Sequence, residues 1–216
     1  NRSLRVAEAA GDRKGICSAL VTVGGAQKGM GDPKAAAISC YKALLIAREL
    51  ADPTREAELL NNLGNLYFDL GRLDQAEGYY AQQKEHSCMH GLAATEAEAV
   101  RNLGMVAASR GEFQVALGRV DTALALMEVA GVPIEDRLVA MNHRGRYLLE
   151  LGRLAEARVA LDSVLHNSLA WHHEVDRSYI LSDLGSIDLA EGRFPRSDSL
   201  FQRSLIAAGR SLEARM

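Results

Sequence analysis

Aromatic residues and prolines are scarce in this chain of 216 residues. Aromatic residues make up only 5% of it and there are 4 prolines, although 48% of the residues are hydrophobic. Alanine, leucine, glutamate and arginine dominate, which favours helix over sheet. Few prolines also leave long helices uninterrupted. The composition therefore predicts an all-helical fold.

Cysteine is equally rare. The three cysteines, Cys17, Cys40 and Cys88, are an odd number without CxxC spacing. This pattern is typical of reduced thiols in a cytosolic protein and not of a disulfide framework. We interpret each as a small buried hydrophobic residue and expect a cytoplasmic location.

The sequence also lacks long runs of basic residues and long runs of apolar residues. The net charge is only −3, and no run of basic residues provides the electrostatic footprint of a nucleic-acid-binding protein. No apolar stretch approaches the roughly 18 residues that span a bilayer. We expect neither a nucleic-acid partner nor membrane insertion. Because Asn1 already stands in a helix-like segment, we expect an excised fragment with neighbouring sequence on both sides.

No catalytic signature is present: GxSxG, HExxH, P-loop and dinucleotide-binding motifs are all missing. Two groups of histidines are the candidate metal ligands, namely His86 and His90 with Cys88, and His166, His172 and His173 beside Trp171. A structural zinc site needs about four ligands, which neither group offers. We therefore interpret them as solvated or packed side chains, and expect no enzyme, no metal and no cofactor.

What the chain does have is a pair of glycines, seven residues apart, that recurs at steps of 40, 40, 41 and 40 residues. The first members are Gly24, Gly64, Gly104, Gly145 and Gly185. The second members are Gly31, Gly71, Gly111, Gly152 and Gly192. A period of this size indicates a stacked array of similar units.

One unit can be read from residues 57–88. Apolar residues around Gly64 follow helical spacing, and Gly71 ends that helix because glycine accepts the left-handed conformation of a helix terminus. A second helical pattern follows from Leu73. Gly64 predicts a close approach of the two helices, with Ala76 or Tyr80 filling the space.

At these residues the chain resembles the tetratricopeptide repeat family. The family pattern of bulky residue, Leu-Gly, aromatic, alanine and aromatic is met by Leu60, Leu63-Gly64, Tyr67, Ala76 and Tyr80. The resemblance implies a right-handed α-solenoid of about five helical hairpins. The usual unit has about 34 residues, so each helix here gains nearly one turn. This long form resembles the repeats of kinesin light chains, LGN-type polarity adaptors and bacterial regulators.

The period predicts six segments: the tail helix of a preceding repeat over 1–12, repeats over 13–52, 53–92, 93–133 and 134–173, and a fifth repeat with a truncated end over 174–216. Asp188 departs from the pattern, because it stands where the first helix of the fifth unit should carry an apolar residue.

Polar residues recur beside the first glycine of each unit, where the first helix should face an open concave groove. An asparagine amide can both donate to and accept from the backbone of an extended peptide. In the resembling arrays asparagines at this place hold ligand backbones, and arginines here would choose an acidic group. The predicted peptide-binding residues are Asn62, Asn65, Arg101, Asn102, Asn142, His143, Arg146 and Asp183. The alternative is that these asparagines only bridge neighbouring helices.

The resulting hypothesis is a protein–protein interaction scaffold that binds an extended peptide or a partner helix in its concave groove. Two alternatives stay open. The array can be the sensory or autoinhibitory region of a larger bacterial signalling protein, such as a kinase, cyclase or transcription regulator. It can also self-associate through its ends.

Overall fold

The computed structural model describes residues 2–167 and 174–213, and all secondary structure within them is helical. The prediction of an all-α repeat solenoid built from helical hairpins is confirmed. The chain divides into two compact units, Asn1–Ser109 and Arg110–Met216.

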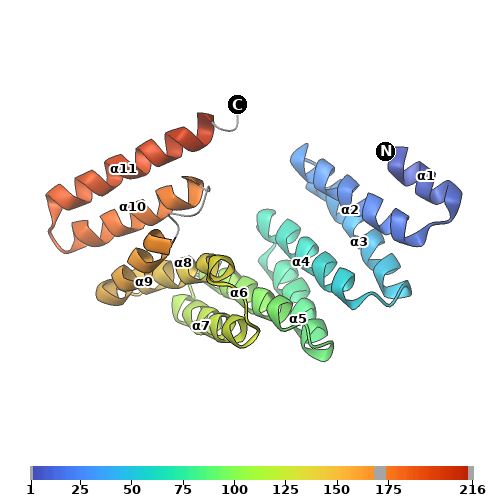
Figure 1. Cartoon of the computed structure of the whole chain (residues 1–216), viewed down its shortest axis with the longest axis horizontal. Helices are drawn as coiled ribbons and strands as arrows, with labels where there is room; N and C mark the ends of the chain where they lie inside the picture. Colours follow the sequence, from blue (N-terminus) through green and yellow to red (C-terminus); the bar gives the residue numbers. More distant parts are fainter. Residues whose placement is uncertain (1, 168–173, 214–216) are drawn as a thin grey trace. The chain divides into compact units, whose positions relative to one another are not determined.

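Over residues 2–109, the first unit forms six helices, which Figure 1 labels. They are α1 (Arg2–Ala10), α2 (Arg13–Gly29), α3 (Pro33–Glu49), α4 (Pro53–Asp69), α5 (Leu73–Met89) and α6 (Ala93–Ser109). Each helix packs against the next along the chain, and α4 also contacts α6. The first helices of neighbouring repeats therefore touch, which matters for the predicted site.

The described residues of the second unit form five helices, which Figure 1 labels. They are α7 (Phe113–Val129), α8 (Ile134–Glu150), α9 (Leu154–Asn167), α10 (Glu174–Ala190) and α11 (Phe194–Glu213). Consecutive helices again pack together, and α8 also contacts α10. The same relationship between first helices thus recurs in this unit.

Local sequence explains where several helices begin. Asp12, Asp32 and Asp52 each accept a hydrogen bond, 3.0 Å long, from the backbone N–H three residues on. A side-chain acceptor at this place satisfies one of the N–H groups that a helix leaves unpaired at its start. Pro33 and Pro53 follow as first helical residues, where the missing N–H costs nothing.

Left-handed residues end the helices. The second glycine of every pair has a positive φ, between 69° and 80°, so the predicted turns are confirmed. Glycines with positive φ also stand between repeats at Gly11, Gly91 and Gly131. At the corresponding junction after α3 the chain uses Ala51 instead, with φ of 49°. Ala51 is the only non-glycine residue with positive φ in the described chain.

The first glycine of a pair is a packing device. A Cβ atom at Gly145 would lie 2.7 Å from the Leu161 side chain, and one at Gly185 would lie 2.8 Å from Phe201. At Gly24 the nearest atom is Sγ of Cys40, at 3.0 Å. Of the two residues expected to fill the space at Gly64, it is Tyr80 that makes the close contact.

The core of each repeat is built from leucine and alanine, with Leu44, Leu60 and Leu63 among its fully buried members in the first unit. All three cysteines are free thiols. Cys17 and Cys40 are buried, as predicted, and burial raises the pKa of both thiols. Cys88 is exposed, so its interpretation as a buried residue is wrong: it faces outward near the end of α5.

Candidate functional site

The predicted site residues of the first unit lie on α4 and α6, where these helices touch. The Asn102 side chain on α6 donates a 2.8 Å hydrogen bond to Oδ1 of Asn61 on α4. Asn61 in turn donates to Oε1 of Glu98 over 3.4 Å. These amides therefore bridge the first helices of two neighbouring repeats, which is the alternative that the sequence left open.

Asn62 and Asn102 occupy the same place in their repeats but have different environments. The exposed fraction of Asn102 is only 2%, so the expectation that its side chain faces an open groove is wrong. Its burial follows from the partner that Asn61 supplies, since a buried amide needs a hydrogen bond. Asn62 is half-buried, and within the described chain its amide makes no hydrogen bond.

Asn65 and Arg101 are both half-buried and both engaged. Asn65 accepts a 2.7 Å hydrogen bond from the hydroxyl of Tyr80. The Arg101 guanidinium lies 3.7 Å from Oε1 of Glu98 and donates to Sδ of Met105 over 3.7 Å. Neither contact is short enough to immobilise Arg101 strongly. Its positive charge is therefore only partly compensated.

In the second unit, the predicted residues lie on α8 and α10. Nε of Arg146 stands 3.5 Å from Oδ2 of Asp183, again joining the first helices of neighbouring repeats. Burial raises the pKa of Asp183 more than the nearby Arg146 lowers it. His143 stacks on Tyr147 with ring centroids 6.0 Å apart, and Oδ1 of the half-buried Asn142 has no hydrogen-bond partner in the described residues.

The arrangement offers hydrogen-bond donors, acceptors and partly compensated charges. Across the described residues, no cluster of three or more His, Cys, Asp or Glu side chains could hold a metal ion. His86 instead contacts the carbonyl of Pro53 at 3.0 Å, and its ring centroid lies 4.3 Å from that of His90 with the two planes tilted by 35°. His172, His173 and Trp171 lie outside the described residues.

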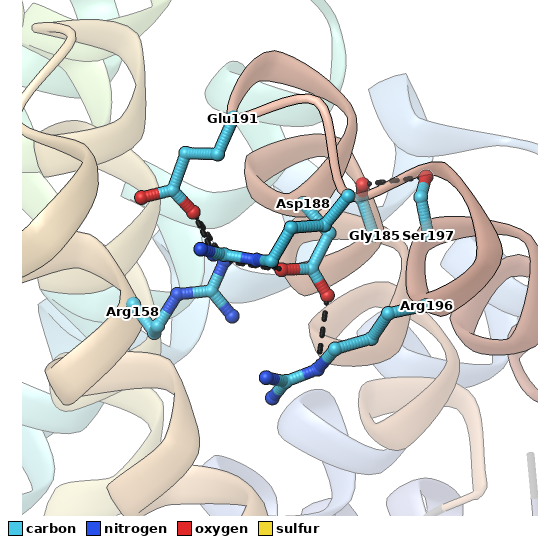
Figure 2. A network of polar contacts seen from close by, with 7 residues as sticks. Arg158, Gly185, Asp188, Glu191, Arg196 and Ser197 are labelled. Atoms are coloured by element: carbon cyan, nitrogen blue, oxygen red, sulfur yellow. Dashed lines mark hydrogen bonds and ion pairs between the residues drawn. The ribbon is translucent and has the colours of Figure 1, made fainter.

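Asp188 is fully buried, as an apolar residue at this place would be, yet it remains a carboxylate (Figure 2). Oδ1 lies 2.5 Å from Arg158 on α9 and 2.7 Å from Arg193, while Oδ2 lies 3.1 Å from Arg196 on α11. Burial alone would raise the pKa of Asp188, but the arginines hold it below its usual value. The cluster joins three helices of the second unit.

A pocket of about 550 Å³ between α3, α4 and α5 was not predicted from the sequence. Tyrosines and basic side chains from all three helices and the turn between α4 and α5 line it. The exposed apolar residues of α3 were the available signal, because Ile38 and Tyr41 recur one turn apart on a surface helix. Repeat periodicity does not reveal them, since other units carry different residues there.

None of the described helices is long and apolar enough to span a bilayer.

Comparison with known families and structures places the chain among helical repeats. A model of the tetratricopeptide repeat matches residues 15–82, and a second model of the same repeat matches residues 104–128 and 138–163. The matches together cover more than half of the chain. No curated protein matches it.

Solved structures resemble the chain more broadly. BtubC (BKLC) from P. vanneervenii superposes with a TM-score of 0.82 at 22% identity, covering 97% of this chain and 88% of that one. A putative kinesin light chain with TPR-like repeats from Podosopora anserina gives 0.69 at 14% identity, covering 91% and 96%. The signal-transduction ATPase with a tetratricopeptide repeat sensor from Pyrococcus horikoshii gives 0.77 at 17% identity, covering 97% of this chain and 32% of that one. At these identities the likeness shows the fold.

Proposed function

Because the chain belongs to the tetratricopeptide repeat family, we propose that it is a protein–protein interaction scaffold. In this proposal it binds an extended peptide or a partner helix along the first helices of its repeats. The family's folds generally serve as binding scaffolds and not as enzymes, and no cofactor is part of the proposal.

Asn62 is the observation that carries the proposal. Its amide is partly exposed and lacks a partner in the described chain, while the adjacent Asn61 is held by Asn102. An amide offers one acceptor and two donors, which suits the backbone of an extended peptide. The bridge between α4 and α6 fixes the surface around Asn62 before any ligand arrives, so binding loses little to ordering of the receptor.

The other predicted residues have different roles in this proposal. Arg101 and Arg146 supply positive charge beside the asparagines, and Arg146 is the more exposed of the two. Asn65, Asn142, His143 and Asp183 supply polar groups within three residues of the repeating glycine in α4, α8 and α10. Asn102 acts as a positioning residue that holds Asn61, since its own side chain is buried.

A peptide-display selection with the whole 216-residue chain as bait tests the proposal. The enriched peptides are synthesised and titrated calorimetrically into the wild type and the Asn62→Ala variant. We expect at least about a fivefold loss of affinity for Asn62→Ala, which corresponds to about 1 kcal/mol for a lost hydrogen bond. Gln82→Ala removes an exposed amide from the second helix of the same hairpin and is the matched control.

The proposal fails if every selected peptide binds Asn62→Ala within about twofold of wild type while the variant keeps its unfolding midpoint. It also fails if Gln82→Ala weakens binding as much as Asn62→Ala, because the loss would then not be specific to the first helices.

A second candidate function is a sensory or autoinhibitory region of a larger bacterial signalling protein. The likeness that favours it spans 97% of this chain and only 32% of the Pyrococcus horikoshii ATPase, a protein with a tetratricopeptide repeat sensor. As part of this second candidate function, we propose a signalling role and a cytoplasmic location for the chain. Sequencing the coding region on both sides of the chain tests it: an adjoining effector domain supports the candidate, and flanks without one reject it.

A further inference from the structure

The pocket between α3, α4 and α5 has an aromatic wall. Tyr67 of α4 and Tyr79 of α5 stack with ring centroids 5.3 Å apart and planes 11° from parallel. Burial raises the pKa of Tyr79, and the neighbouring Tyr67 and Tyr41 reinforce that shift. The Tyr79 phenol therefore stays neutral at physiological pH, so this wall combines apolar ring faces with a hydroxyl that can donate a hydrogen bond.

The opening of the pocket is apolar and uncovered. On α3, Ile38 is 58% exposed and Tyr41 is 47% exposed. They stand three residues apart, so they share one helix face. Leu70, at the end of α4, completes the rim at 36% exposure. Single exposed apolar residues are common, but three converging on one aromatic-lined pocket mark a place where an apolar group can be buried.

Positive charge surrounds this apolar opening. The lining includes Lys34, Lys42 and Arg72, and it includes no carboxylate. Neither lysine has an ion-pair partner within the described chain, in contrast to Lys28, whose Nζ lies 2.7 Å from Asp69. The pocket is thus locally basic on a chain whose net charge is −3. Clustered charge of one sign attracts and selects a partner of the opposite sign.

We propose that this tyrosine pocket docks a short acidic segment of a partner protein. One large aliphatic or aromatic side chain of the segment enters the pocket beside Tyr67 and Tyr79. Flanking carboxylates pair with Lys34 and Lys42 at the rim. The pocket volume of about 550 Å³ lies within the range of specific ligand pockets, about 300–1,000 Å³. One large side chain therefore fits inside it.

The inference goes beyond the proposed function, because the pocket uses the outer face of α3 and not the row of polar residues around Asn62. The two can fail separately: binding that depends on Asn62 and binding that depends on Ile38 are measured with different variants. The chain would then present two surfaces, one suited to peptide backbone and one suited to an acidic segment with a single apolar anchor.

The test selects random dodecapeptides on the whole chain at low salt, with counter-selection on an Ile38→Ser variant. Fluorescein-labelled copies of the enriched peptides are then titrated by fluorescence anisotropy. We expect enrichment of Asp and Glu next to a large apolar residue. We expect Ile38→Ser to weaken binding at least about tenfold, because serine removes aliphatic surface that the docked side chain would bury. Leu45→Ser, an exposed leucine of the same helix outside the pocket, is the matched control.

Reversing the lysine charges at the rim distinguishes charge-dependent recognition of an acidic peptide from nonspecific hydrophobic binding. We expect Lys34→Glu combined with Lys42→Glu to weaken binding at least about tenfold at low salt. Raising the ionic strength should narrow this difference, since salt screens exposed charges. Lys84→Glu, an exposed lysine of α5 outside the pocket lining, should leave affinity within about twofold.

Several results would overturn the proposal. They are a selection without enrichment, enrichment of basic or wholly apolar peptides, and equal binding by the Ile38→Ser and Leu45→Ser variants. Sedimentation of the wild type provides a further check. Dimers that dissociate on Ile38→Ser substitution would assign the pocket to a second copy of this chain instead of an acidic partner.

Discussion

A Cβ atom at Gly64 would lie 2.4 Å from Cε1 of Tyr80, closer than real Cβ atoms approach any neighbour. Tyr80 is fully buried, and its hydroxyl donates to Oδ1 of Asn65 over 2.7 Å. Burial raises the pKa of the Tyr80 phenol well above its usual value. The ring is thus held from both ends, so it cannot swing away to admit a methyl group.

We therefore expect Gly64→Ala to lower the free energy of unfolding by about 1 kcal/mol. Overpacking costs about 1–3 kcal/mol, which outweighs the roughly 1 kcal/mol that alanine gains from its helix propensity. Gly78→Ala is the control, because no atom lies within 4 Å of its added Cβ on the exposed side of α5. It should stabilise by up to about 1 kcal/mol. Urea unfolding compares the two, and equal stabilities would contradict the packing role of Gly64.

Replacing Ala51 with glycine should stabilise the protein. Its φ of 49° is left-handed, a conformation that costs an L-residue about 1–2 kcal/mol, and glycine occupies this place at the other described junctions. After the extra flexibility of glycine in the unfolded chain is subtracted, Ala51→Gly should stabilise by about 0.5–1 kcal/mol. Ala130→Gly, at a helix end with φ of −75°, should not stabilise. A lower thermal midpoint for Ala51→Gly would contradict the prediction.

Asn102 and Asn62 should differ in stability although they occupy the same place in successive repeats. Asn102→Ala leaves Oδ1 of Asn61 without its 2.8 Å donor in the contact between α4 and α6. We expect a loss of about 1–2 kcal/mol in the free energy of unfolding. Asn62→Ala removes a partly exposed amide without a partner and should change stability by less than about 0.5 kcal/mol. Chemical denaturation measures both, and equal losses would contradict the difference in burial.

The glycines show which parts of the fold the sequence can predict. A turn that needs positive φ, or a helix contact without room for a Cβ, constrains one residue type at one place, so Gly71 and Gly64 could be read directly. The state of Asn102 depends on which residue the neighbouring repeat places opposite it, and the period alone does not carry that information.

The tyrosine pocket is a feature that the sequence pattern could not predict. Tyr41, Tyr67 and Tyr79 come from three helices and stand at different places relative to the repeating glycines. Their convergence is a property of how α3, α4 and α5 pack. A pattern search along one helix face therefore finds only part of the pocket.

Replacing Asp188 with the apolar residue that the family usually has at this place should destabilise the protein. Asp188→Leu would restore an apolar residue at a fully buried place, but it would remove the carboxylate that pairs with Arg158, whose side chain is only 16% exposed. Breaking a buried ion pair from one side costs about 3–5 kcal/mol, although Glu191 at 2.7 Å would still partly compensate Arg158. We expect a loss of about 3 kcal/mol by urea unfolding. A stabilised Asp188→Leu variant would show that the arginine cluster does not hold α9, α10 and α11 together.

The buried Asp188 and the partly buried Asp183, both on α10, should respond to pH in opposite directions. The folded-state pKa of Asp188 is lowered, so its stabilisation is complete above the usual value of 3.8 and is lost as pH falls through the folded pKa. Burial raises the pKa of Asp183 despite the nearby Arg146, so the folded state there binds its proton more tightly. Stability then falls as pH rises from 3.8 through the raised pKa.

Asp183→Asn therefore should stabilise the protein at neutral pH, and the gain should shrink to nothing below pH 3.8, where both states are protonated. Asp188→Asn should destabilise at neutral pH, and its deficit should shrink as pH falls below the same value. Urea midpoints of both variants and the wild type across this pH range provide the measurement. A constant difference between Asp183→Asn and wild type at every pH would mean that the Asp183 carboxylate is not penalised by burial. The partial pairing with Arg146 would then offset the full cost of placing that charge between α8 and α10.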